Sequence, residues 1–175
     1  MSNGILEVRG RLAVAQFWPN GSSDADTVTI SLATDQPPFC FRSAPGTAWN
    51  ETQVFEGAVV TGAVRKAPIS AKRRLTIRLI GIDAPELHCG ATARLKKTKQ
   101  TAEQQALWKQ FGKEYRQPYA ESAVVALAER LGGVGNVLDC VVRTRVDMPN
   151  EVFDCYGRLV GDLFVELDGV PFQVN

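Results

Sequence analysis

Short stretches of alternating or β-branched apolar residues, separated by clusters of turn-forming residues, run through most of the chain. This pattern is typical of strands in a β-rich domain. It predicts strands over residues 7–18, 24–32, 74–82 and 137–146, and a further strand within residues 151–167. Residues 19–23 should turn between the first two strands and make them a hairpin, and Asp168-Gly169 should form a turn after the last strand.

A helical pattern occupies residues 120–131, where apolar residues recur at the spacing of one helix face. Pro118 is suited to open this helix and Gly132-Gly133 to end it. Residues 101–115 are compatible with a second helix. Five strands with a helix inserted before the fourth are compatible with a closed β-barrel of the oligonucleotide-binding type, which is an α+β fold. Other α+β arrangements share this order of elements.

The predicted central strand, residues 74–82, holds charged residues at its middle and at its exit. From Leu79 onward the strand is apolar at both parities, which predicts burial on both faces. Arg78 interrupts the apolar run, and a buried guanidinium needs an anionic partner. Asp83 and Glu86 follow at the exit of the strand. A structural ion pair and a functional site are both consistent with this pattern.

Size and composition predict one domain spanning residues 1–175, because 45% of the 175 residues are apolar and allow a hydrophobic core. Lys and Arg total 20 against 19 Asp and Glu, so the net charge of +1 does not itself indicate a polyanionic partner. The distribution is uneven: residues 65–78 contain six cations and no acid. A second basic cluster lies within residues 94–99. A phosphate-binding face would draw on this middle part of the chain, although the same charges also suit solvated loops.

The sequence shows neither a stretch of membrane-spanning length nor a recognisable signal peptide. An intracellular location is therefore the default expectation, and the compartment stays unknown. The chain has 4 cysteines and 1 histidine with no C-x-x-C spacing, which argues against a structural zinc site. Reduced thiols are expected. Whether Cys140 and Cys155 pair stays open, since they flank a predicted turn near residues 148–150.

Three short motifs occur together in a specific order. They are Asp24-Ala-Asp-Thr-Val28, Arg78-Leu-Ile-Gly-Ile-Asp-Ala-Pro-Glu86 and Asp154-Cys-Tyr-Gly-Arg158. In this order and local context, the chain resembles the staphylococcal-nuclease-like (thermonuclease) family. The resemblance covers the first two strands, the central strand and the chain from about Pro118 onward. It does not cover about 34–72 or 88–116, which are interpreted as two insertions.

The resemblance implies a Ca²⁺ site made by the carboxylates of Asp26 and Asp83 and the backbone carbonyl of Ala84. It also implies that Glu86 is the general base that activates the attacking water. This donor set agrees with elementary chemistry, because Ca²⁺ is a hard ion that prefers carboxylate, carbonyl and water oxygens. His88, close to Glu86 in the sequence, is more consistent with an ordinary loop residue.

The resemblance further implies that Arg78 and Arg158 grip the phosphate, with Tyr156 beside the bound substrate. The implied activity is hydrolysis of phosphodiester bonds in DNA or RNA, leaving 3′-phosphate ends. A phosphodiester gains negative charge in the transition state, and guanidinium groups can neutralise that charge bidentately. The sequence therefore predicts a Ca²⁺-dependent nuclease whose partner is a nucleic-acid substrate, with no membrane partner.

Two features leave other functions open. Ala25 stands where the family commonly has glycine, and a required positive φ there would tilt Asp26 away from the metal. Taken singly, the aspartates suit turns and strand caps, and the arginines suit solvated strand ends. A non-catalytic module of the nuclease fold that binds nucleic acid or protein is one alternative. A structural subunit of a larger assembly is another.

The end of the chain alternates apolar residues at Val170, Phe172 and Val174. An alternating apolar tail needs a strand to pair with it or a segment to cover it. We expect this cover from residues 99–116, which contain Trp108 and Phe111. A protein partner that covers the short C-terminal segment is the alternative.

Overall fold

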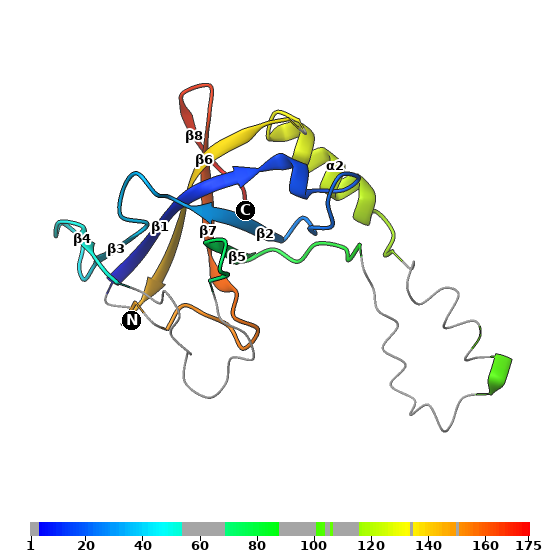
Figure 1. Cartoon of the computed structure of the whole chain (residues 1–175), viewed down its shortest axis with the longest axis horizontal. Coiled ribbons are helices and arrows are strands. Elements are labelled where there is room, and N and C mark those ends of the chain that lie inside the picture. The colour runs from blue at the N-terminus through cyan, green and yellow to red at the C-terminus, as the bar shows by residue number, and fades with distance from the viewer. Residues whose placement is uncertain are drawn as a thin grey trace.

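Five strands close into a β-barrel in the computed structural model of the protein, which describes residues 4–53, 69–87, 101–103, 106, 116–133, 135–149 and 151–175 (Figure 1). The barrel strands are β1 (Gly4–Ala13), β2 (Thr27–Leu32), β5 (Arg74–Leu79), β6 (Val137–Val146) and β7 (Leu159–Leu167). They pair in the order β1–β2–β5–β7–β6, and β6 pairs with β1 to close the barrel. Only the β5–β7 pairing is parallel among these strands. The predicted α+β barrel of the oligonucleotide-binding type is confirmed at this level.

The predicted helix at residues 120–131 is confirmed as α2 (Ala120–Arg130), which lies between β5 and β6 in the chain and at one end of the barrel (Figure 1). Its inner face contributes Ala120, Val124 and Ala128 to the hydrophobic core. Gly132 and Gly133 follow with φ angles of 88° and 87°. Glycine adopts this left-handed conformation without steric strain, so the pair ends the helix as predicted.

Three further strands among the described residues extend the sheet beyond the barrel. β3 (Phe39–Arg42) pairs with the N-terminal half of β1, and β4 (Asn50–Glu51) pairs with β3. Both lie in the first expected insertion, where the sequence pattern had not predicted them. β8 (Val170–Gln173) pairs with β7.

The two strands that carry the site, β2 and β5, alternate inward and outward side chains as an antiparallel pair should. The inward residues form part of the core; they are Val28, Ile30, Leu32, Leu75, Ile77 and Leu79. The outward residues carry hydroxyl or guanidinium groups; they are Thr27, Thr29 and Ser31 on β2 and Arg74, Thr76 and Arg78 on β5. We call this second set the β2–β5 lane.

The predicted burial at the end of the central strand is wrong. β5 ends at Leu79, and the side chains that follow are solvent-accessible: Ile80 is 47% and Ile82 36% exposed. Gly81, between them, has a φ angle of 76°, which turns the chain away from the sheet. These apolar residues therefore belong to the loop that leads into the candidate site.

The apolar tail pairs within the chain itself. The turn at Asp168-Gly169 is confirmed, with φ angles of 53° and 77°, and β8 returns antiparallel to β7. Phe172 and Val174 pack against the core. The predicted cover by residues 99–116 lies largely outside the described residues, including Trp108 and Phe111.

The thiols of Cys40, Cys140 and Cys155 are free, and burial raises the pKa of Cys140 to about 12. Cys140 lies opposite Val165 inside the sheet, whereas Cys155 is exposed.

A membrane-spanning helix is absent from the part of the chain that the structure describes.

Candidate active site

Arg78 lies in the outward row of β5 and joins two carboxylates. Its Nη1 is 2.5 Å from Oδ2 of Asp26, and its Nη2 is 2.7 Å from Oδ1 of Asp83. Burial disfavours the charged guanidinium, but hydrogen bonds to Asp83 and Asp26 outweigh this effect and raise the pKa of Arg78. The anionic partner predicted for this arginine is therefore present.

Asp26 is the buried carboxylate of the pair, with an exposure of 1%. Its Oδ1 accepts a 2.9 Å hydrogen bond from the Thr27 hydroxyl, and its Oδ2 accepts one of 2.8 Å from the backbone N–H of Ala84. Ala25 is not among the described residues with a positive φ angle, so the missing glycine causes no backbone strain. Asp26 therefore ties the segment before β2 to the loop after β5.

Asp83 differs from Asp26 in its surroundings. The side chain of Asp83 is 88% exposed, although it pairs with the same guanidinium. Its position at the exit of β5 keeps it available to solvent ions and ligands. The loop thus presents Asp83 outward, while the next residue, Ala84, is anchored to Asp26 through its N–H group.

Asp24 fixes the far end of this loop and acts electrostatically on Glu86. Oδ1 of Asp24 accepts a 2.9 Å hydrogen bond from the backbone N–H of Leu87. Burial raises the pKa of Glu86, and the charge of Asp24, a hydrogen bond to Asp24 and the charge of Asp26 raise it further, whereas Arg78 lowers it. Three carboxylates and one guanidinium therefore influence one another at this end of the barrel.

Gln117 holds the backbone of Glu86 from the segment that precedes α2. The Glu86 N–H donates to Oε1 of Gln117 at 3.0 Å, and the Gln117 N–H donates to the Glu86 carbonyl, also at 3.0 Å. The same glutamine accepts the N–H of Ala120 through its own carbonyl. The start of the helix thereby fixes the position of the candidate base.

Arg158 is held in a tight turn by Asp154. Oδ2 of Asp154 accepts the Arg158 Nε–H at 2.7 Å, and Oδ1 accepts the backbone N–H groups of Tyr156 and Arg158 at 2.9 and 2.8 Å. Gly157 in this turn has a φ angle of 79°. The guanidinium carbon of Arg158 lies 5.2 Å from the centre of the Tyr156 ring, which is a cation–π distance.

The parallel β5–β7 pairing places Arg158 shortly before the strand that neighbours Arg78. Arg78 pairs with Val160, and Arg158 precedes Val160 by two residues in the chain. The structure thus brings the first two motifs together around Arg78 at one end of the barrel. Arg158 itself forms its ion pair with Asp154 of the third motif.

The chemistry of the carboxylates fits a hard divalent cation. Asp24, Asp26 and Glu86 offer oxygen donors only. The pKa of Glu86 is raised first by burial and then by the like charge of Asp24 and Asp26, which a cation would relieve. In the described residues, however, no three His, Cys, Asp or Glu side chains are already arranged around a common point that could hold a metal ion. Arg78 instead bridges the two predicted ligands, Asp26 and Asp83.

Three contributing residues were not among the predicted site residues. Asp24 shares a motif with Asp26, and its separation by one residue could have indicated a common role. Asp154 opens the motif that ends at Arg158, and its hydrogen bonds are local, to residues two and four positions further along the chain. An aspartate at the start of a turn could have indicated this role. Gln117 lies outside every motif, and the sequence carries no signal for its contact with Glu86.

A comparison of the chain with protein-family models, curated proteins and solved structures found no match.

Proposed function

We propose that this protein is a metal-dependent nuclease of the staphylococcal-nuclease-like type, with Ca²⁺ as its cofactor and DNA or RNA as its substrate. One observation carries the proposal: Arg78 contacts Asp26 and Asp83, while Glu86, whose pKa is raised, lies in the electrostatic field of Asp24, Asp26 and Arg78. Perturbed acids clustered with a guanidinium are typical of catalytic sites. The barrel of the oligonucleotide-binding type is compatible with the proposed family.

In the proposed reaction, the Glu86 carboxylate takes a proton from a water molecule whose oxygen bonds to phosphorus. The bond between phosphorus and the 5′ oxygen breaks, and solvent returns a proton to the leaving oxygen. Arg78 and Arg158 donate hydrogen bonds to the phosphoryl oxygens as negative charge grows on them. A Ca²⁺ ion held by Asp26, Asp83 and the Ala84 carbonyl would supply further charge neutralisation.

The raised pKa suits Glu86 to this role. A carboxylate whose pKa lies above its ordinary value accepts a proton more readily once it is ionised. The Glu86 side chain is only partly buried, and Gln117 restricts its backbone. Glu86 therefore combines basicity with a defined position.

The test is digestion of an end-labelled single-stranded DNA and a matching RNA with Ca²⁺, with Mg²⁺ and with EGTA. We expect cleavage with Ca²⁺, weaker cleavage with Mg²⁺ and none with EGTA, because Mg²⁺ demands tighter octahedral geometry. As a control, the variant Arg145→Ala should cleave like the wild-type protein, since this exposed arginine lies on β6, away from the site. Cleavage that persists unchanged in EGTA would overturn the metal-dependent mechanism, and binding without cleavage would favour the non-catalytic module.

A further inference from the structure

The β2–β5 lane leads from the candidate site to a turn at the other end of the two strands. We call this turn, residues 70–73, the basic turn. Thr27 pairs with Arg78, Thr29 with Thr76, and Ser31 with Arg74. The hydroxyl oxygens of Thr29 and Thr76 are 3.5 Å apart across the pair. From Arg74 to Arg78 the lane extends about 13 Å along the strand.

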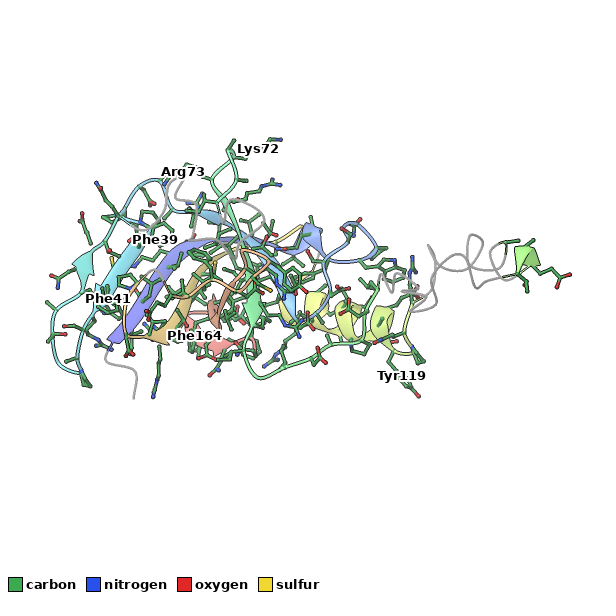
Figure 2. All side chains as sticks on the ribbon, turned by 90° about the horizontal axis from the view of Figure 1, so that it is seen from below. Phe39, Phe41, Lys72, Arg73, Tyr119 and Phe164 are labelled. Atoms are coloured by element: carbon green, nitrogen blue, oxygen red, sulfur yellow. The ribbon has the colours of Figure 1, made fainter. Side chains whose placement is uncertain are left out.

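The basic turn is built firmly onto the end of the lane. The N–H of Arg73 donates to the Ser70 carbonyl at 2.9 Å, and the Ser70 hydroxyl oxygen accepts the N–H of Arg74 at 3.1 Å. The carbonyl of Arg73 accepts the N–H of Leu32 at 2.9 Å, which fastens the turn to β2. Figure 2 shows Lys72 and Arg73 on this turn, which projects from the body of the barrel.

The charged residues of the lane are all positive. None of its outward residues is acidic, and in the described part of the chain neither Lys72 nor Arg74 forms an ion pair. The acids gather instead beyond Arg78, at Asp26 and Asp83. The surface therefore runs from free cations through hydroxyl groups to the acidic candidate site.

The outer surface of β1 and β6, which adjoins the lane where Arg11 pairs with Ser31, is a useful contrast, because its cations are neutralised. Glu7, with an exposure of 4%, pairs with both Arg9 and Arg143, and Arg11 pairs with Asp139. The cleft of about 620 Å³ on that side is lined by three arginines and three acids. Its balanced charge gives no preference for an anionic ligand.

We propose that the β2–β5 lane, together with Lys72, binds the sugar–phosphate backbone of a single-stranded nucleic acid on one side of the bond to be cut. This inference rests on the proposed function for its substrate class. Arg74 and Lys72 pair with backbone phosphates, and the Ser31 hydroxyl and one hydroxyl of the Thr29–Thr76 pair donate to phosphate or sugar oxygens. The substrate thus reaches Arg78 along the strand direction of β5.

Tyr156 favours a single strand over a duplex. Tyr156 is 66% exposed, and its ring lies beside Arg158, shortly before β7, the strand that pairs with β5. An exposed aromatic face stacks on a base only when that base is not already stacked within a duplex. One row of cations also matches one backbone rather than two. The lane and the tyrosine together therefore describe a track for an unpaired strand.

The test is fluorescence anisotropy of labelled oligonucleotides with the full chain in EDTA, which separates binding from cleavage. For an eight-nucleotide single strand we expect Lys72→Ala/Arg74→Ala to weaken binding about tenfold, the effect of losing a charge-assisted contact. The slope of log affinity against log salt should become shallower by about 1.4, since each lost single-strand phosphate contact contributes about 0.7. A dinucleotide that reaches only the site should show no loss.

Arg130→Ala/Arg145→Ala is the matched control, because it removes the same charge from exposed positions on α2 and β6, outside the lane. The inference is overturned if this control weakens binding equally, if the lane variant binds like the wild type, or if no oligonucleotide binds. An equal loss of affinity for polyglutamate would also overturn it, since the lane would then select charge alone. Binding through the lane without any cleavage under Ca²⁺ would refute the proposed nuclease while leaving the lane supported.

Discussion

The side-chain amide of Asn175 donates a 2.9 Å hydrogen bond to the backbone carbonyl of Ile80, the residue that follows β5. The same amide group donates to Asp162 at 2.7 Å, and its oxygen accepts the N–H of Leu163 at 2.9 Å. The segment after β8 is therefore fastened both to β7 and to the loop that presents Asp83. The stability of that loop depends on a residue far away in the sequence.

Asn175→Ala should lower the free energy of unfolding by about 1–2 kcal/mol, because it leaves the partly buried N–H of Leu163 without a partner. It should also lower kcat more than it raises KM, since the loop carrying Asp83 loses an anchor. Urea denaturation and steady-state kinetics measure the two effects. Gln173→Ala is the control, because its amide makes only an exposed hydrogen bond to Asp162. Equal behaviour of the two variants would contradict the anchoring role.

Asp26 and Asp83 should differ sharply in their contributions to stability. Asp26→Ala removes a buried partner of Arg78 and leaves the Ala84 N–H unpaired, and should cost about 2–4 kcal/mol. Asp83→Ala should cost less than about 0.5 kcal/mol, because its carboxylate is largely in solvent. Thermal and urea unfolding in the absence of metal measure the stability loss of each variant. Similar losses for the two variants would contradict the burial assigned to Asp26.

The pH dependence of cleavage should report Glu86. Because burial and Asp24 raise the pKa of Glu86 above the ordinary value of 4.5 for a glutamate, the rate should rise with pH through a midpoint above that value. Asp24→Asn removes the neighbouring charge and should move the midpoint to lower pH. Rates measured across the acidic range at saturating Ca²⁺ provide the comparison. An unchanged midpoint would show that another group sets the profile.

The conformation of the turn around Arg158 should depend on the hydrogen bonds that Asp154 accepts. Asp154→Ala frees the guanidinium and two backbone N–H groups, so Arg158 loses its fixed direction. We expect a loss of about 2 kcal/mol or more of transition-state stabilisation if the arginine no longer reaches the phosphate reliably. A double-mutant cycle measures the coupling between the two residues: the cleavage rates of Asp154→Ala, Arg158→Ala and the double variant are each compared with the wild-type rate. Fully additive losses would indicate that the two residues act independently.

The sequence predicted those elements whose signals are local. β6 has the predicted bounds of residues 137–146, and Leu138, Cys140, Val142 and Val146 are buried along its inner face. The helix before it was recognisable from its apolar spacing and the two glycines that end it. The first strand was predicted too long, since Val14–Gln16 form a 3-10 turn in which the backbone leaves the extended conformation.

The remaining features depend on contacts between distant residues. β3 follows Pro38 and lacks a clear alternation, so its pairing with β1 could not be inferred from pattern alone. The exposure of Ile80 depends on the turn at Gly81, although its apolar side chain suggested burial. The contact of Gln117 with Glu86 likewise joins segments that share no motif.

The proposed catalytic role of Glu86 is tested most directly by measuring the cleavage rate and the melting temperature of Glu86→Gln side by side. A carboxyl group with a raised folded-state pKa contributes stability below its unfolded pKa of about 4.5, and this contribution is lost as pH rises through the folded pKa. At neutral pH, replacing the carboxylate should therefore leave the melting temperature equal or higher. The account predicts a fall in rate of about a hundredfold or more in the Ca²⁺-loaded variant. Cleavage by Glu86→Gln at the wild-type rate would contradict it.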